Sequence, residues 1–353
     1  MRIAQLTTNF QTVSARFGKA IGSHVGTLTD GLVRRGHELH VFAPSDSETL
    51  GELHSVTETL ARGSTPRDLS QHLTNLNISR CYEFAPKNID IVHSHFTLLS
   101  SYIAAISDVP TLVSVHSPID ERMRDFANAF KSLRYVSFSL AQRTLAPELN
   151  WYANIYHGVD MNLFEFNPEP EDYFLYLGRI TEDKGVHHAI AAAKAAGVPL
   201  RIAGTSYPAE GYWQKEVEPH IDATNVRYFG EASFESKIEL LQKAKGLLFP
   251  TQVDEVFGYA MIEAMACGTP VIGFNNGSVP EIVKDGVTGF VVEDADQMAD
   301  AIRKIDTIDR KKVRQRAETF FSVEKMIAGY EAVYKRIIAE MAYSRNKKNG
   351  GAA

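Results

Sequence analysis

The stretch HVGTLTDGLVRRGHELHVFA, residues 24–43, decides the fold. Apolar residues recur at helical spacing from Val25 to Val33, and this pattern ends at Gly36. The β-forming run ELHVFA follows directly, and a similar run, RIAQLT, begins at Arg2. A strand, a helix and a second strand in this order predict a parallel sheet covered by helices.

The same alternation continues along the chain and restarts after the polar segment NPEPED, residues 167–172, which is typical of a linker. A length of 353 residues corresponds to about two domains. We therefore expect an α/β fold with two Rossmann-like domains, residues 1–166 and 167–325. A helical pattern over residues 326–343 either closes the second domain or crosses back to the first. The polar tail, residues 344–353, is expected to be disordered.

Composition narrows the class of protein. Lys and Arg number 37 and Asp and Glu 43, and the net charge of −6 argues against binding to nucleic acid or to an anionic membrane. The two cysteines, Cys81 and Cys267, are too isolated for a disulfide framework or a metal knuckle. No apolar run reaches the ~18–20 residues of a membrane span, and the first residues do not resemble a signal peptide. We expect a cytoplasmic protein without an integral membrane segment.

The most informative stretch for chemistry is EVFGYAMIEAMACGTPVIGF, which begins at Glu255. Glu255 lies at the mouth of a predicted helix. The backbone NH groups of Phe257, Gly258 and Tyr259, together with the helix dipole, form a site for a diphosphate there. A side chain at Gly258 would hold the phosphate away from the backbone.

Glu263 lies eight residues after Glu255, about 12 Å along a helix, which is roughly the length of a sugar-diphosphate-ribose unit. Its carboxylate is placed to accept hydrogen bonds from ribose hydroxyls. The alternative is that Glu255 is an ordinary N-terminal helix acid and Glu263 a solvated side chain. Against this, Glu263 lies inside the apolar run AMIEAMA, where a carboxylate is costly without a partner.

This stretch resembles glycosyltransferase family 4, the retaining enzymes of the GT-B fold. The family motif has two glutamates separated by seven residues, with Phe-Gly after the first, and Glu255, Phe257-Gly258 and Glu263 match it. The resemblance implies GT-B architecture, with the two Rossmann-like domains facing each other across a cleft. It also implies a nucleotide-diphosphate sugar as co-substrate, its sugar held by the first glutamate and its ribose by the second, with no cofactor required.

A second constellation is YLGRITEDKGV, in which Arg179 ends a strand and Lys184 opens the next helix. Two fixed cations at one strand end can neutralise a departing diphosphate without a metal ion, although surface cations alone would give the same pattern. The family resemblance implies that Arg179 and Lys184 hold the donor's phosphates. Further family matches include Gly230-Glu231 and GSVPEIVKDGVTGF from Gly277. We expect Phe229 to Glu231 to lie beside the nucleotide base and the Gly277 motif to be mainly architectural.

Histidines near the ends of first-domain strands form a third group. His116 ends the strand TLVSVH at the carboxyl edge, where ligands of α/β folds bind. A similar family histidine touches the donor sugar, so His116 joins Arg179, Lys184 and Glu255 as an expected catalytic residue. Without the family resemblance, the alternative interpretation is that His116 is an ordinary hydrogen-bonded polar residue at a strand end. His93 and His95 share one strand face, which leaves joint metal ligation open, but no third ligand lies nearby in the sequence.

The loop after the first strand departs from the family, which has a Gly-Gly pair there. This chain has Lys19-Ala20, so we expect a shifted phosphate or acceptor loop formed by Gly18, Lys19 and Gly22. The alternative for Lys19 is an ordinary surface lysine. Asp294-Ala295-Asp296 spells a metal signature of another glycosyltransferase fold, but it precedes a helical pattern. We therefore expect Asp294 to cap that helix, and we expect no metal site.

Together these features predict a retaining glycosyltransferase that moves a hexose from a nucleotide sugar, with UDP favoured, to a hydroxyl of an acceptor. A small soluble acceptor is favoured over a lipid. Two alternatives stay open: a GT-B nucleotide-sugar 2-epimerase, which needs no acceptor, and a non-catalytic nucleotide-binding subunit. A dehydrogenase is disfavoured because no GxGxxG follows a predicted first strand.

Overall fold

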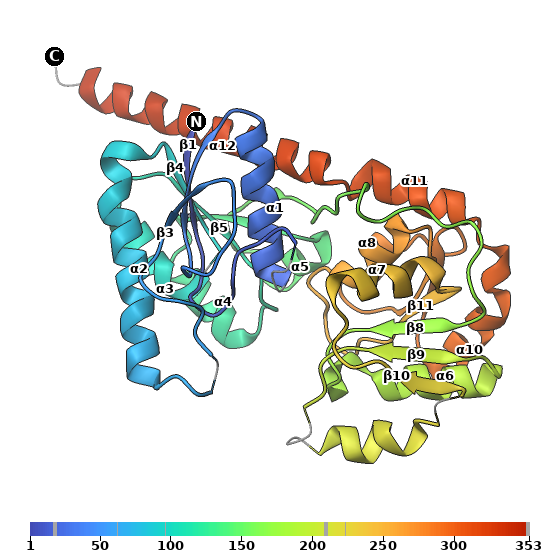
Figure 1. Ribbon diagram of the computed structural model, residues 1–353. Helices are drawn as coiled ribbons and strands as arrows, with labels where there is room; N and C mark the ends of the chain where they lie inside the picture. The colour runs from blue at the N-terminus through green and yellow to red at the C-terminus, as the bar shows by residue number, and fades with distance from the viewer. Residues whose placement is uncertain (17–19, 62, 96, 208–210, 223, 351–353) are drawn as a thin grey trace. The chain divides into compact units, whose positions relative to one another are not determined.

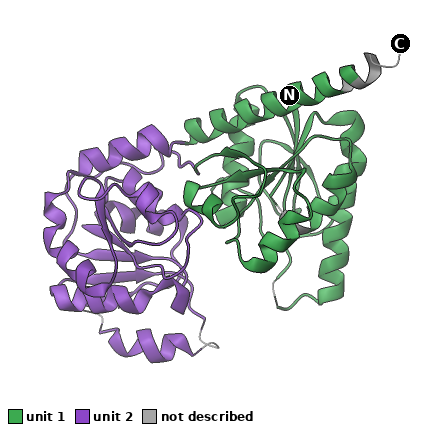
Figure 2. Cartoon of the chain, turned by 180° about the vertical axis from the view of Figure 1, so that it is seen from behind, with its two compact units in different colours: residues 1–156, 323–353 green, residues 157–322 purple. Residues whose placement is uncertain are grey.

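The computed structural model describes residues 1–16, 20–61, 63–95, 97–207, 211–222 and 224–350. The chain divides into two compact units, shown in different colours in Figure 2. Unit 1 comprises Met1–Tyr156 and Val323–Ala353, and unit 2 comprises His157–Ser322. Both units are α/β structures built on a parallel sheet (Figure 1).

Unit 1 contains a seven-stranded sheet in the order β3-β2-β1-β4-β5-β6-β7, with parallel pairing throughout. The strands are β1 Arg2–Leu6, β2 Glu38–Phe42, β3 Glu52–His54, β4 Ile91–Ser94, β5 Thr111–Ser114, β6 Arg134–Ser137 and β7 Trp151–Asn154. The helices are α1 Ala20–Arg34, α2 Arg67–Asn88, α3 Thr97–Ile106, α4 Glu121–Asn128, α5 Leu140–Thr144 and α12 Val323–Gly350.

Helices cover both faces of this sheet because side chains alternate along each strand. Ile3 is buried in the core that includes Leu28 of α1 and Tyr330 of α12. Its neighbour Ala4 is buried in the opposite core, which includes Ile78 of α2. The sheet is therefore enclosed, and polar side chains gather where its strands end.

The last helix, α12, packs in unit 1 alongside α1 (Figure 1). Its buried residues include Tyr330 and Tyr334. The helix continues to Gly350, whereas the polar composition from Ser344 onward predicts a disordered tail. Lys and Arg are good helix formers, so backbone hydrogen bonds can extend from the preceding turns without an apolar face.

Unit 2 contains a six-stranded sheet in the order β10-β9-β8-β11-β12-β13, again with parallel pairing. The strands are β8 Phe174–Leu177, β9 Leu200–Ala203, β10 Val226–Tyr228, β11 Gly246–Phe249, β12 Val271–Phe274 and β13 Gly289–Val292. The α-helices are α6 Val186–Ala196, α7 Phe234–Lys243, α8 Tyr259–Ala266, α9 Val279–Ile282, α10 Ala295–Lys304 and α11 Arg310–Phe320. The order reverses between β8 and β11, and such switch points are where α/β sheets bind ligands.

Two local predictions can be compared with this structure. The division between the units falls after Tyr156, earlier than the linker predicted at residues 167–172. The intervening segment packs in unit 2, since His157 stacks on Tyr259. Asp294 caps α10 as predicted, its side chain accepting a hydrogen bond from the Gln297 backbone NH at 2.8 Å.

Candidate active site

The loop that leaves β8 carries the first predicted site residues. The Tyr176 hydroxyl donates to the Arg179 carbonyl oxygen at 2.7 Å, which closes the turn. The chain then forms one 3-10 turn, η1 Glu182–Lys184. The Arg179 side chain is 57% exposed, and its Nη2 lies 3.5 Å from Asp183 Oδ2. Because this ion pair is exposed and long, it leaves the guanidinium able to engage an anion.

Lys184 and Glu255 meet directly. Lys184 Nζ lies 2.5 Å from Glu255 Oε2, and the two side chains are only 19% and 16% exposed. One residue follows β8 and the other follows β11, so the pair lies at the switch point of the unit 2 sheet. The sequence analysis assigned Lys184 to the donor's phosphates and Glu255 to its sugar. In the structure the two side chains form an ion pair with each other.

The Glu255 loop is fixed by the segment after β12. The backbone NH of Ser278 donates to the Glu255 carbonyl oxygen at 2.9 Å, and the Ser278 hydroxyl donates to the Phe257 carbonyl oxygen at 2.9 Å. Gly277 has φ +53°, and a Cβ there would lie 2.3 Å from the Glu255 nitrogen. The motif that begins at Gly277, predicted to be architectural, thus determines where Glu255 lies.

Gly258 is the N-cap residue of α8, and it offers no side-chain acceptor to the first amides of that helix. Its φ of +84° belongs to the left-handed region, and a Cβ would lie 2.7 Å from Met261 Cε and 3.4 Å from Glu255 Cγ. The sequence predicts a glycine here for close approach of a phosphate. The structure adds that any side chain would strain the backbone and crowd the Met261 and Phe249 side chains. Tyr259, the first residue of the helix, stacks on His157 at 4.5 Å between ring centroids.

Glu263 is buried on α8, and it has the partner that its apolar surroundings require. Lys237 Nζ, from α7, lies 2.5 Å from Glu263 Oε1. The same ammonium lies 5.0 Å from the ring centroid of Phe234. The sequence analysis missed Lys237. The sequence does indicate that the buried Glu263 carboxylate needs a nearby cation. The spacing of residues does not identify which lysine of α7 supplies it.

The loops after β8, β9 and β10 are joined through glycines. The Gly204 NH donates to the Gly230 carbonyl oxygen at 2.8 Å, and a Cβ on Gly204 would lie 1.8 Å from the Gly178 carbonyl oxygen. Gly230 has φ +70° and precedes the exposed Glu231. These predicted base-binding residues therefore lie at the same sheet edge as Arg179. A hollow of about 600 Å³ beside the β8 loop is lined by Arg179, Thr181, Glu182, Asp183 and Gln252.

In unit 1, His116 lies two residues beyond β5, and its Nε2 is 2.9 Å from His95 Nδ1. His95 Nε2 is 2.7 Å from Gln5 Oε1, an acceptor, so in a neutral imidazole Nε2 carries the proton and Nδ1 accepts from His116. Burial lowers the pKa of His116 well below its usual value, and His24 and His93 add to the effect. His116 is therefore a neutral imidazole whose orientation is fixed by His95.

His24 and His93 in unit 1 are also buried. His93 lies 2.7 Å from both the Tyr334 hydroxyl and the Ser114 hydroxyl, so both of its ring nitrogens have hydrogen-bond partners. Burial lowers the pKa of His24, on α1, to about 3. The ring nitrogens of His24, His95 and His116 lie within 4.8 Å of one another. This cluster combines His95 with His24 from α1 and with His116 from the segment after β5. The sequence near His93 and His95 did not indicate either partner.

The predicted loop of Gly18, Lys19 and Gly22 is described only in part, since Gly18 and Lys19 lie outside the described residues. Gly22 is buried in the first turn of α1, and a Cβ there would lie 2.0 Å from the Thr12 carbonyl oxygen. Gly22 thus allows α1 to pack closely against the segment that precedes it.

Two family models match this chain. Residues 21–161 match glycosyltransferase family 4, and residues 163–319 match glycosyl transferases group 1. This chain is a family 4-like glycosyltransferase. The sequence resemblance is thereby confirmed.

Relatives of the transferase agree with this. The O-antigen chain mannosyltransferase C of Escherichia coli is 22% identical over 346 residues, covering 88% of this chain and 92% of that protein. Sucrose-phosphate synthase from Thermosynechococcus elongatus has a TM-score of 0.80 at 19% identity, over 96% of this chain and 100% of that one. Anabaena HepE, solved with UDP and glucose, has a TM-score of 0.74 at 18% identity, over 95% and 99% of the two chains. The transferase therefore has the predicted GT-B fold.

Among the described residues, no helix combines the length and the apolar character that crossing a bilayer would require.

Proposed function

We propose that this transferase is a retaining hexosyltransferase that uses a nucleotide-diphosphate sugar, with UDP as the nucleotide. The observation that carries the proposal is the Lys184–Glu255 ion pair at the switch point of unit 2, with Arg179 on the same loop as Lys184. Uridine is supported by the structure of HepE, a protein of the same fold, with UDP and glucose.

The donor's diphosphate takes Glu255's place beside Lys184. An ammonium already held in position loses little conformational freedom when a phosphate replaces the carboxylate, and Arg179 adds a second, exposed cation. Glu255 is then released to accept hydrogen bonds from the sugar hydroxyls. The backbone NH groups of Phe257, Gly258 and Tyr259 complete the diphosphate site at the start of α8.

The rest of the nucleotide is bound further along the sheet edge. Lys237 Nζ donates a hydrogen bond to Glu263 Oε1. The other carboxylate oxygen, Oε2, therefore accepts the hydrogen bond from a ribose hydroxyl. Gly230 and Glu231 flank the base.

In the transfer step, the bond between the anomeric carbon and the diphosphate oxygen breaks while the acceptor oxygen bonds to that carbon on the same face. The acceptor's proton passes to the departing diphosphate. The protein's task is to stabilise negative charge on the leaving group, which Arg179 and Lys184 perform without a metal ion. We propose a small soluble acceptor and a cytoplasmic setting.

The test is a thermal-shift panel of UDP, GDP and ADP hexoses followed by product analysis. Donor binding stabilises the folded chain, so a UDP-hexose should raise the Tm of the wild type and raise it much less for Lys184→Gln. Lys215→Gln, which removes an exposed lysine of unit 2, is the control and should respond like the wild type. Absence of a shift with every nucleotide sugar would contradict the proposal.

Product analysis separates the remaining alternatives. NMR of the glycoside formed with a panel of small acceptors should show the anomeric configuration of the donor. A changed sugar formed from the donor alone would instead indicate a 2-epimerase. Binding without any turnover would indicate a non-catalytic subunit.

A further inference from the structure

The tripeptide Glu-Leu-His occurs twice in unit 1, at residues 38–40 and 52–54, on the neighbouring strands β2 and β3. In the parallel register His40 lies opposite Glu52. Because side chains alternate along a strand, the glutamates and histidines of both copies share one sheet face, while the two leucines point to the other. The repeat therefore gathers two imidazoles and two carboxylates on one small patch.

The ring nitrogens and carboxylate oxygens of three side chains in this patch converge. His40 Nδ1 lies 3.0 Å from His54 Nε2 and 3.4 Å from Glu52 Oε2, and His54 Nε2 lies 3.5 Å from Glu52 Oε1. Ligand atoms placed tetrahedrally at about 2.0 Å from a zinc ion are about 3.3 Å from one another. The three side chains thus already have the spacing of one face of a tetrahedral metal site.

A second carboxylate orients the buried histidine. Glu38 Oε1 lies 3.1 Å from His40 Nε2, so the His40 proton is on Nε2 and the lone pair of Nδ1 is directed at His54 and Glu52. Metal-binding histidines typically donate their other ring NH to a carboxylate in this way. His40, His54 and Glu52 are therefore arranged like the ligands of a metal ion, and Glu38 is placed like the carboxylate that orients a metal-binding histidine.

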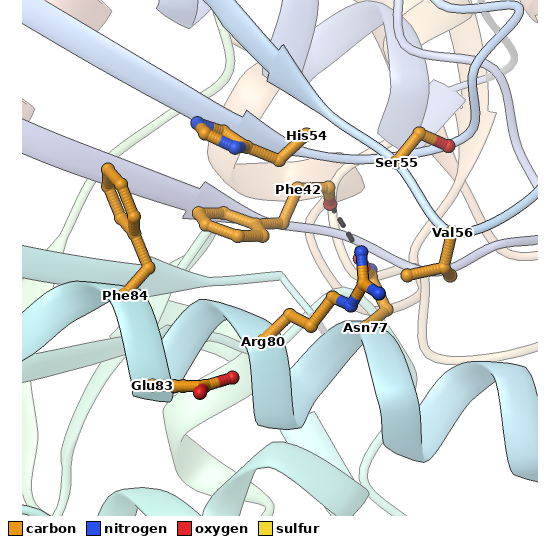
Figure 3. A pocket seen from close by; sticks show the side chains of 8 residues that line it. All are labelled: Phe42, His54, Ser55, Val56, Asn77, Arg80, Glu83 and Phe84. Atoms are coloured by element: carbon orange, nitrogen blue, oxygen red, sulfur yellow. Dashed lines mark hydrogen bonds between the residues drawn. The ribbon is translucent and has the colours of Figure 1, made fainter.

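Aromatic packing holds both rings in place. His54 stacks on Phe42 at 4.6 Å between centroids, and Phe84 of α2 lies 4.9 Å from His40 and 5.0 Å from His54. His54 also lines a pocket of about 450 Å³, which Figure 3 shows with Phe42 and Phe84 near the His54 ring.

We propose that His40, His54 and Glu52 bind one divalent ion of the zinc class, with Glu38 as the outer carboxylate. Two imidazoles and one carboxylate suit Zn²⁺, whereas Mg²⁺ and Ca²⁺ prefer oxygen ligands alone. The Glu52 side chain is 66% exposed, so water supplies the fourth ligand. The ion fastens β3, an edge strand of three residues, to β2. The site uses no residue assigned to glycosyl transfer.

The test is calorimetric titration of the full chain with Zn²⁺ after treatment with EDTA and desalting. The wild type should bind one ion per chain at this site. Glu52→Gln should weaken binding about 100-fold, and Glu38→Gln about 10–100-fold, as expected for an outer-shell carboxylate. Glu48→Gln, which changes another exposed carboxylate of unit 1, is the control and should bind like the wild type.

Two further measurements test whether the ion is bound at this site and whether the variants are folded. Co²⁺ should give the visible absorption of a four-coordinate ion in the wild type and in Glu48→Gln, and this absorption should be lost in Glu52→Gln. Circular dichroism without metal establishes that the variants are folded. Equal Zn²⁺ affinity of Glu52→Gln, His54→Asn and the wild type would overturn the proposal. In that case the repeat is a hydrogen-bonded pair only, or the ion is bound by His24, His95 and His116, which His95→Gln would abolish.

Discussion

The two units carry sheets of the same kind, yet the carboxyl edges of these sheets hold different chemistry. In unit 2 the edge is ionic, with Lys184 paired to Glu255 and Lys237 paired to Glu263. In unit 1 the edge is a buried set of histidines whose pKa values are lowered, His24 and His116 among them. The fold provides the same location twice, and the side chains decide whether it attracts an anion or presents neutral hydrogen-bonding groups.

The largest expected effect tests the ionic edge. Arg179→Ala should lower kcat by about 100-fold to 1000-fold, or about 3 kcal/mol, because it removes a cation from the leaving diphosphate. Arg303→Ala, which removes a surface guanidinium paired with Asp300 on α10, should leave kcat unchanged. Steady-state kinetics with a UDP-hexose measure both. An unchanged kcat in Arg179→Ala would place the leaving-group chemistry elsewhere.

Lys237→Met should lower the free energy of unfolding by about 2 kcal/mol, because it leaves the buried Glu263 carboxylate without its cation. Lys243→Met on the same helix breaks only exposed ion pairs and should lower the free energy of unfolding far less. Urea unfolding gives both values. Equal costs for the two variants would mean that the Glu263 ion pair is no more than a surface contact.

The histidine edge predicts a pH dependence. A histidine whose pKa is lowered on folding contributes nothing above the unfolded value of about 6.5, since both states are then neutral. As the pH falls below this value the unfolded chain binds the proton first, so stability decreases down to the folded pKa, which is about 3 for His24.

Each such histidine contributes a slope of up to about 1.4 kcal/mol per pH unit. His24→Gln should therefore flatten the pH dependence of the free energy of unfolding between about pH 6 and pH 5. If the His24 variant keeps the wild-type slope, the buried histidine is protonated in the folded chain.

Two glycines with similar backbones offer the smallest and most local comparison. Gly258 in unit 2 has φ +84° and close neighbours, whereas Gly36 in unit 1 has φ +82° and nothing near its absent Cβ. Changing either to alanine should cost about 1 kcal/mol of stability from backbone strain. Only Gly258→Ala should also raise the KM for the donor several-fold, because the new methyl group clashes with Met261 and Phe249 and displaces the backbone at the start of α8. An unchanged KM would remove Gly258 from the donor site.

The sequence was sufficient for the parallel-sheet architecture and for the family, because strand–helix periodicity and the glutamate motif are local signals. It was insufficient for α2 Arg67–Asn88, whose buried positions include Thr74 and Asn77, so that an apolar pattern does not mark the helix. Partners of the candidate site were also hidden. That Glu263 needs a cation follows from its neighbours in sequence, but the identity of Lys237 depends on how α7 packs against α8.

The same limit applies to the unit 1 histidines. His93 and His95 are visible as a pair, whereas the approach of His24 follows from the packing of α1 on the sheet. The repeated Glu-Leu-His tripeptide is plain in the sequence, but only the strand register brings His40 opposite Glu52. Contacts between elements are set by tertiary packing, which a single sequence does not display.

The exchange of Glu255 for diphosphate at Lys184 is tested most directly by the affinity for UDP of two variants, measured by calorimetry. Lys184→Gln should weaken UDP binding by about tenfold or more, because it removes an ammonium from the phosphate site. Glu255→Gln should bind UDP as tightly as the wild type or more tightly, since the ammonium no longer has a competing carboxylate, while its rate of transfer falls. Equal weakening of UDP binding by both substitutions would contradict the exchange.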